Sequence, residues 1–293
     1  VGAYSIFKIK KENKPENIPV MGVMGAFVFA TQMVNFTIPG TGSSGHLCGG
    51  LLLSALIGPY GGFLSMMAIL LLQCLLFADG GLMAYGCNVW NMAFYACFFG
   101  YFCIYKPILG KNPSKKKILI ASILGSVLSL QLGAFSVTLE TLISGVTELP
   151  FLTFLSFMQP IHLAIGFVEG LITSAVLIFV YNTRPEMLNL NEKSNEFSFK
   201  KVIAILSIVT VLIGGGISLL ASSSPDGLEW SMENVAGSTE LDSKGSAYDK
   251  ASEIQEKTTL LPDYSISNSN NEILGTSFSG VLGSVLVAVI LIG

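Results

Sequence analysis

Long apolar stretches, separated by short polar loops, run through most of the chain. They are continuous rather than alternating, and several approach the length of about 20 residues that a helix needs to cross a bilayer. The candidate spans are Ile18–Ile38, Leu47–Gly58, Tyr60–Phe77, Cys87–Tyr105, Lys117–Ser144, Pro160–Tyr181, Val202–Leu220 and Thr276–Gly293. We expect all of them to be helices, because lipid otherwise tolerates only closed barrels, whose strands alternate. The pattern predicts an all-α membrane protein, a polytopic transmembrane helix bundle.

Composition supports this fold class. Hydrophobic residues make up 51% of the 293 residues and charged residues only 12%, whereas soluble domains carry about 25% charged residues. We therefore expect a multi-pass protein of the cell membrane, in contact with the lipid bilayer. The net charge of −3 and the lack of a basic patch interleaved with aromatic residues exclude nucleic acid as a partner.

The basic residues predict the topology. They gather in three short segments, around Lys8–Lys14, Lys106–Lys117 and Arg184–Lys201. The positive-inside rule places all three on the cytoplasmic side. For the spans to alternate, Leu47–Phe77 must then cross twice, with a turn at the "GPYGG" segment, Gly58–Gly62. The first arm is short for a span, so we expect it to be tilted or partly buried in protein.

This topology puts one set of polar features on the outer face: His46, the "ADGG" loop at Ala78–Gly81, Asn88, His162 and the loop Ala221–Leu274. That loop holds ten acidic residues against three lysines. It suits an exterior domain facing a cation, although a solvated linker is the plainer interpretation and is favoured from Ser265 onward.

Small residues within the spans are expected to serve packing. Six glycines indicate close helix approach: Gly22, Gly25, Gly49, Gly50, Gly125 and Gly133. Five cysteines lie in or beside apolar segments without a CxxC pair, at Cys48, Cys74, Cys87, Cys97 and Cys103. We interpret them as small buried hydrophobic residues rather than a metal cluster or disulfides.

The segment "GTGSSGH", residues 40–46, carries one of only two histidines. A phosphate-binding loop is excluded, because no Gly-Lys-Ser/Thr follows a GxxxxG pattern and no apolar strand precedes it. A plain turn is a real alternative, with His46 capping the next helix. The chain shows no nucleotide site elsewhere, so ATP-driven work would need another subunit.

Polar residues inside or at the ends of spans favour a functional site over a plain turn at His46. They are Gln32, Asn35, Asn88, Asn91, Glu140 and Glu169. Such groups are costly in lipid and by default face a bundle interior or a functional cavity. His162 and Glu169 are seven residues apart and share one helix face. Imidazole is the commonest metal ligand, but two histidines do not fill a site. For His162, a hydrogen bond to neighbouring backbone is favoured over ligation. The residues alone indicate a polar outer pocket for a divalent cation.

Three segments resemble the CbiM/NikM substrate-binding component of nickel and cobalt energy-coupling factor transporters: "VMGVMGAFVFATQMVNFTIPGTGSSGHLCGGLLLSALIGPYGG", "LLFADGGLMAYGCNVWNM" and "HLAIGFVEGLITSAVL". The segment "SSSPDGLEW" is similar to the NikN-type partner. The resemblance implies residues 1–185 as a metal-binding membrane component, 186–201 as a cytoplasmic linker and 202–293 as a NikN-like domain with two spans and an outer loop.

The resemblance also implies the site. In the family, nitrogens of the N-terminal residues and of a second-position histidine hold the metal, and the histidine of the SGHL motif, here His46, completes a planar set that suits Ni(II). The family's opening Met-His-Ile-Pro-Asp-Gly motif is absent, and both ends read as parts of spanning helices. We therefore expect the remaining ligands in a missing N-terminus. His162, Asn88, Asn91 and Asp79 are expected to support the outer pocket.

The resemblance implies a transporter subunit rather than an enzyme, with Ni²⁺ or Co²⁺ as transported substrate and no cofactor. Its expected partners are a transmembrane coupling subunit and two ATP-binding subunits. Nickel is favoured over cobalt, because the "SPDGLEW" loop resembles partners in nickel systems. Two alternatives stay open. A secondary cation carrier would need inverted repeats, and none is found. An intramembrane hydrolase using Asp79 or His162 would need a second group within reach.

Overall fold

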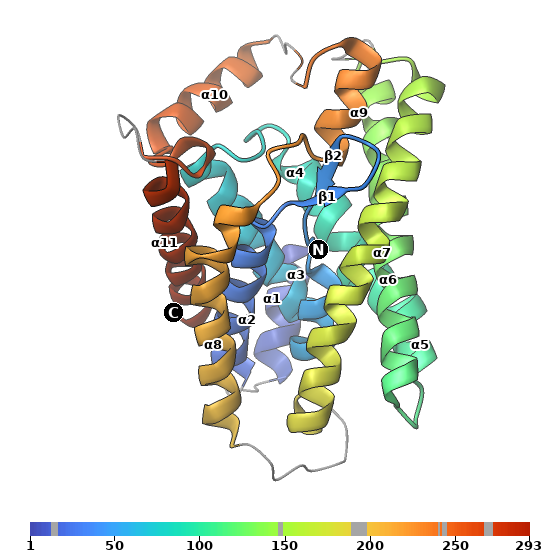
Figure 1. The fold of residues 1–293 in the computed structure, drawn as a ribbon, viewed down its shortest axis with the longest axis vertical. Helices are drawn as coiled ribbons and strands as arrows, with labels where there is room; N and C mark the ends of the chain where they lie inside the picture. The colour runs from blue at the N-terminus through green and yellow to red at the C-terminus, as the bar shows by residue number, and fades with distance from the viewer. Residues whose placement is uncertain (13–16, 146–148, 189–197, 240, 242–244, 267–271) are drawn as a thin grey trace.

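The computed structural model describes residues 1–293 except 13–16, 146–148, 189–197, 240, 242–244 and 267–271, and its described part is mainly helical (Figure 1). The longer helices are α1 (Gly2–Glu12), α2 (Asn17–Gln32), α3 (Gly50–Phe77), α6 (Lys115–Ser144), α7 (Phe151–Thr183), α8 (Phe199–Gly215), α9 (Gly227–Ala236), α10 (Ser246–Thr258) and α11 (Glu272–Ile292). A further continuous helix joins α4 (Tyr85–Asn88), the π-helix η1 (Val89–Tyr105) and α5 (Lys106–Leu109). Short 3₁₀ turns are η2 (Pro185–Leu188), η3 (Ile217–Leu220) and η4 (Pro262–Tyr264).

Five of the described helices are long and apolar enough to cross a bilayer: Gly50–Phe77, Tyr85–Leu109, Lys115–Ser144, Phe151–Thr183 and Ile273–Ile292. The apolar part of α2, Ile18–Gln32, is shorter. These helices confirm the predicted class, an all-α multi-pass membrane protein.

The basic segments gather at one end of the bundle. The end of α1, the start of α6, the end of α7 and the start of α8 all lie at the bottom of Figure 1, and α9 and α10 lie at the top. We call these the inner and the outer end. The helices therefore alternate in direction as the lysine positions predicted, with the basic segments on one side. Lys14 and Lys193 lie outside the described residues.

Helix α3 is a helical hairpin rather than one straight span. Gly58 is non-helical, with φ 80° and ψ 160°. A Cβ built on Gly62 would lie 2.8 Å from the backbone nitrogen of Ser54, whereas residues eight apart in a straight helix are about 12 Å apart. The predicted reversal at the "GPYGG" segment is therefore confirmed. The first arm is buried, with Leu51 and Leu52 at 0% exposure, as its shortness required.

Two predicted boundaries are wrong by more than five residues. The span predicted to run to Ile38 ends at Gln32, and the chain then forms the antiparallel hairpin of β1 (Phe36–Ile38) and β2 (Ser43–Gly45). The Pro-Gly sequence at 39–40 favours this turn, and Gly40 and Gly42 take the positive φ that it needs. Helix α7 begins at Phe151 and contains Pro160, which was predicted to start it. Packing of Phe154 and Met158 beside α9 stabilises this extra length.

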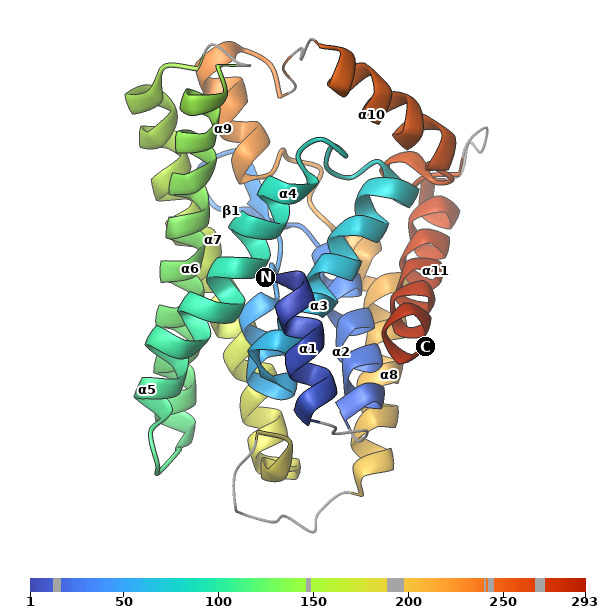
Figure 2. The ribbon, with the colours of Figure 1, turned by 180° about the vertical axis from the view of Figure 1, so that it is seen from behind.

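Glycines permit the close helix contacts that the sequence predicted. Helices α8 and α11 pack side by side against α2 (Figures 1 and 2). A Cβ on Gly22 would lie 2.5 Å from Ile292 of α11, and one on Gly133 of α6 would lie 2.6 Å from the carbonyl oxygen of Asn91. Added Cβ atoms would crowd neighbours at the other four positions too, Gly25, Gly49, Gly50 and Gly125. The packing role of all six is confirmed.

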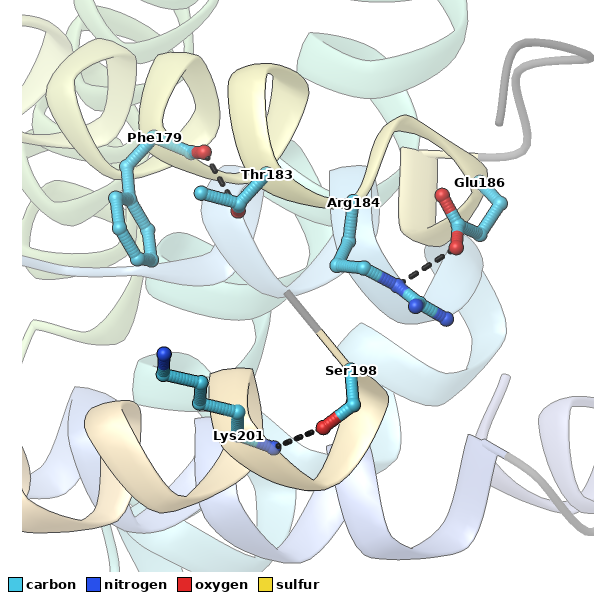
Figure 3. Close-up of polar contacts among 6 residues, drawn as sticks. All are labelled: Phe179, Thr183, Arg184, Glu186, Ser198 and Lys201. Carbon is cyan, nitrogen blue, oxygen red and sulfur yellow. Dashed lines mark hydrogen bonds and ion pairs between the residues drawn. The ribbon is translucent and has the colours of Figure 1, made fainter. Parts of the chain in front are cut away.

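At the inner end, α7 stops and α8 begins (Figure 3). Arg184 pairs with Glu186 at 2.6 Å just after α7. The Ser198 hydroxyl accepts a hydrogen bond from the backbone N–H of Lys201, at 3.3 Å, and so caps the start of α8. Each helix end thus carries its own local stabilisation on this side of the bundle.

Candidate metal centre

His46 lies in the extended segment between β2 and the first arm of α3, near the outer end. Its ring is half-buried, and Nδ1 lies 3.2 Å from the carbonyl oxygen of Leu47. Because a carbonyl oxygen only accepts hydrogen bonds, Nδ1 is the donor in this contact, and Nε2 is the ring nitrogen left for a metal. Metal-binding histidines commonly have one ring nitrogen fixed in this way. The turn interpretation holds for residues 40–42, and the same loop presents a ligand-competent imidazole.

A buried carboxylate holds the backbone just after His46. Glu169 of α7 is 0% exposed. Its two oxygens accept the N–H groups of Cys48 and Gly49, each at 3.1 Å. These N–H groups precede the first turn of α3, where a negative charge also interacts favourably with the helix dipole. Glu169 therefore fixes the path of the chain two and three residues beyond His46.

Two buried amides hold the same segment through its carbonyl. Gln32 donates through Nε2 to the carbonyl oxygen of Cys48 at 2.8 Å, and Gln73 donates to Gln32 Oε1 at 3.0 Å. Sequence analysis singled out Gln32 and Glu169 as costly polar groups but missed Gln73. Its signal was the same: an amide inside an otherwise apolar run. Cys48 is thus hydrogen-bonded on both its N–H and its C=O side.

His162 lies on α7 beside this loop. Its Nδ1 donates to the carbonyl oxygen of Met158 at 2.8 Å, which confirms the backbone hydrogen bond favoured from the sequence. The free Nε2 is directed at the start of α9, because a Cβ on Gly227 would lie 3.0 Å from Cε1 and 3.4 Å from Nε2 of His162. His162 and Glu169 both interact electrostatically with His46. The shared helix face predicted for these two residues therefore faces the His46 loop.

The "SPDGLEW" segment docks directly on the β-hairpin. Ser44 donates its N–H to the carbonyl oxygen of Pro225 at 2.8 Å and its hydroxyl to that of Ser224 at 2.7 Å. Trp230 Nε1 donates to the carbonyl oxygen of Thr41 at 3.0 Å. Figure 1 shows α9 beside β2 and α7. Residues 224–230 of the predicted outer loop are therefore docked on the hairpin and are not a solvated linker.

The other predicted pocket residues lie elsewhere on the outer half. Asn91 donates to Glu140 on α6 at 2.8 Å, Asp79 accepts from Tyr264, and Asn88 lies beside Gly80. Among the described residues, none of the three predicted side chains hydrogen-bonds to His46 or His162. In the described part of the chain, Asp79 and His162 form no hydrogen bond with each other: Asp79 accepts from Tyr264, and His162 donates to the carbonyl oxygen of Met158.

Metal-ligand chemistry among the described residues is sparse. They contain no group of three or more His, Cys, Asp or Glu side chains arranged to hold a metal ion, so His46 could supply only part of a coordination shell. Cys48, Cys74 and Cys97 are buried, as predicted. The burial prediction is wrong for Cys87 and Cys103, which are exposed on a helix whose surface other elements cover only in part.

Comparison with known proteins identifies the family. Residues 1–187 match the CbiM family, described as the cobalt uptake substrate-specific transmembrane region. The chain belongs to this family. Residues 200–293 match the PDGLE domain, the same part of the chain that docks on the hairpin. The family match spans α1 to α7 and the β-hairpin, and it includes both histidines.

Two relatives are fused nickel transport proteins, and a third is a cobalt transport protein that matches a shorter part of this chain. The putative fused nickel transport protein NikMN of Archaeoglobus fulgidus is 32% identical over 284 residues, covering 97% of this chain and 87% of the relative. The probable fused nickel transport protein LarMN of Lactiplantibacillus plantarum is 32% identical, covering 80% and 73%. The cobalt transport protein CbiM of Sorangium cellulosum is 32% identical and covers 58% of this chain. These relatives are transport proteins rather than enzymes.

A solved structure supports the fold of a large part of the chain. The crystal structure of a truncated transition metal transporter is 29% identical, with a TM-score of 0.53, and covers 61% of this chain and 87% of that protein.

Proposed function

We propose that the chain is the metal-capturing membrane component of an ATP-driven nickel importer of the energy-coupling factor type. The observation that carries this proposal is the outer contact between the two parts of the chain. The PDGLE segment bonds to Ser44, two residues before a ligand-competent His46. In the two fused relatives described above, the same two-part organisation occurs in proteins named for nickel transport.

The proposed chemistry is capture of a divalent metal by nitrogen ligands. His46 Nε2 supplies one nitrogen, and imidazole suits nickel, cobalt, copper and zinc. The family resemblance assigns the other ligands to nitrogens of the family's N-terminal motif, so binding experiments should use a protein that carries that motif. Hydrogen bonds of Glu169 and Gln32 with the Cys48 backbone hold the His46 segment in place before metal binds. Less conformational entropy is then lost on binding.

The proposed energy source lies on other subunits. The sequence has no phosphate-binding loop pattern, so ATP hydrolysis is assigned to two separate ATP-binding subunits that act through a transmembrane coupling subunit. The alternative, a self-sufficient secondary cation carrier, would move metal without them.

Uptake of radiolabelled Ni²⁺ distinguishes the two. Cells expressing the full-length chain with the coupling and ATP-binding subunits should accumulate nickel, and cells with the chain alone should not. His46→Ala should abolish high-affinity binding and uptake, because one open position disrupts the coordination plane. Uptake by the chain alone would favour the carrier, and unchanged binding in His46→Ala would return His46 to a turn residue.

Metal preference is tested separately by competition. Nickel is proposed over cobalt from the PDGLE part, because imidazole nitrogen accepts both ions. Unlabelled Co²⁺ is titrated into cells taking up labelled Ni²⁺. Nickel preference requires that cobalt compete only at a concentration above that of nickel. Displacement at an equal or lower concentration would identify cobalt as the preferred ion.

A further inference from the structure

Three ligand-bearing residues from distant parts of the sequence converge at the outer end. Ser44, two residues before His46, bonds to Pro225, one residue before Asp226. His162 packs on Gly227, one residue after Asp226. The side chain of Ile165 contacts both Gly45 and Gly227. These contacts bring Asp226 and His162 to the segment that leads into His46, and His162 interacts electrostatically with both Asp226 and His46.

Asp226 has spare ligand capacity. It caps α9, and the N–H groups of Leu228 and Glu229 both donate to Oδ1, at 2.8 and 2.9 Å. Neither bond uses Oδ2. His162 likewise has Nδ1 bonded to Met158 and Nε2 directed at Gly227. An oxygen of Asp226 on the PDGLE segment and a ring nitrogen of His162 on α7 are therefore both available beside the His46 loop.

We propose that Asp226 and His162 form a transit site, which binds a divalent transition metal from the outer side and passes it to His46. The inference rests on the proposed function and assigns a role to two residues outside the final ligand set. The site supplies one carboxylate oxygen and one imidazole nitrogen, with water completing the shell. Two protein ligands hold a metal weakly, which suits rapid transfer to a site with more nitrogens.

Charge also supports this role. A carboxylate beside the binding loop raises the local concentration of cations, so its loss should slow capture rather than weaken the final complex. The fused domain then contributes a functional group as well as packing. Gly227 fits the same arrangement, because a side chain there would crowd both Ile165 and the His162 ring.

The chain offers matched variants. Asp226→Asn removes the charge but keeps an N-cap residue of similar strength. His162→Gln removes the imidazole. Glu229→Gln is the control: it removes a carboxylate from the same helix turn, and Gln keeps the capping box that Glu229 closes by accepting from the N–H of Asp226.

The variants are compared in the complete transporter by Ni²⁺ uptake and in the purified full-length chain by Ni²⁺ binding at equilibrium. Asp226→Asn and His162→Gln should raise the Ni²⁺ concentration for half-maximal uptake about 10-fold, with the maximal rate and the equilibrium binding unchanged. Glu229→Gln should match the wild type. Uptake kinetics like those of Glu229→Gln would overturn the transit site, and so would loss of equilibrium binding in Asp226→Asn. If His46→Ala takes up nickel normally, the proposed function itself fails.

Discussion

The PDGLE domain touches the outer end of the CbiM part in two places built from different groups. The hairpin contact joins Ser224, Pro225 and Trp230 to Thr41 and Ser44. The loop contact joins Gln255 and Tyr264 to residues 74–82, and Gln255 alone bonds to Cys74, Gly80 and Leu82 at 3.0–3.1 Å. Only the hairpin contact adjoins His46. The hairpin contact is therefore expected to serve metal capture, and the loop contact to serve attachment.

The two contacts also differ in backbone conformation. At the loop contact, three non-glycine residues have positive φ: Ala78, Asp263 and Tyr264. Such conformations cost roughly 1–2 kcal/mol each, and stacking of Tyr264 on Phe77, with ring centroids 4.7 Å apart, offsets part of that cost. In the hairpin contact, positive φ falls on Gly40 and Gly42. Of the two contacts, only the loop contact therefore has non-glycine residues at positive φ.

Of the substitutions that test this comparison, Glu169→Gln is expected to have the largest effect on stability and nickel binding. Glu169 holds the backbone just after His46, next to the hairpin contact. The new amide can accept only one of the two N–H groups and sets its own NH₂ against the other. An unpaired buried donor costs about 1–3 kcal/mol, so thermal stability in detergent and nickel affinity should both fall. Glu140→Gln is the control, since its amide oxygen can still accept from Asn91. Equal losses in the two variants would contradict a specific role for Glu169.

Gly227→Val should disrupt the hairpin contact, and its effect on nickel uptake should be the next largest. Its side chain would meet His162 and the Cδ1 atom of Ile165, which lies 2.8 Å from the Cβ position. Nickel uptake by the complete transporter should fall about 10-fold, because even small displacements of positioned groups are costly. The control is Gly237→Asn at the end of α9, where the Cβ position is open and Asn tolerates positive φ. Normal uptake in Gly227→Val would show that the contact is dispensable.

Gln255→Ala tests the loop contact and should affect stability more than transport. It removes three hydrogen bonds, each worth about 0.5–1.5 kcal/mol net. The melting temperature should drop by a few degrees, with uptake at the permissive temperature near that of the wild type. Lys257→Ala on the same helix removes only an exposed ion pair with Glu253 and should change little. A loss of uptake in Gln255→Ala as large as in Gly227→Val would remove the distinction between the contacts.

The sequence predicted the parts of this architecture that leave a local signal. Apolar runs marked the helices, glycines marked close contacts, and lysine placement required the reversal at Gly58. The docking of Ser224 and Pro225 on Ser44 could not be predicted, because two polar loops some 180 residues apart share no periodicity. The π-helix η1 likewise has no pattern that separates it from an α-helix. For the candidate site, polarity within apolar runs identified Gln32 and Glu169, but only the structure shows that both hold Cys48.

The smallest expected effect concerns pH at the loop contact. Burial, and then the nearby Asp79 carboxylate, raise the pKa of Tyr264 well above its ordinary value, while in the unfolded chain it titrates near 10. The native state then holds more protons than the unfolded state above about pH 10, so this stabilisation is complete below that pH and declines as pH rises toward the native pKa. The difference in melting temperature between wild type and Tyr264→Phe should be constant from neutral pH to about 9.5 and narrow above about 10. Taking the difference removes the titration of lysines and other tyrosines, which both proteins share. A difference that stays flat to pH 11 would mean that the Tyr264 hydroxyl is solvated and that the loop contact rests on stacking and Gln255 alone.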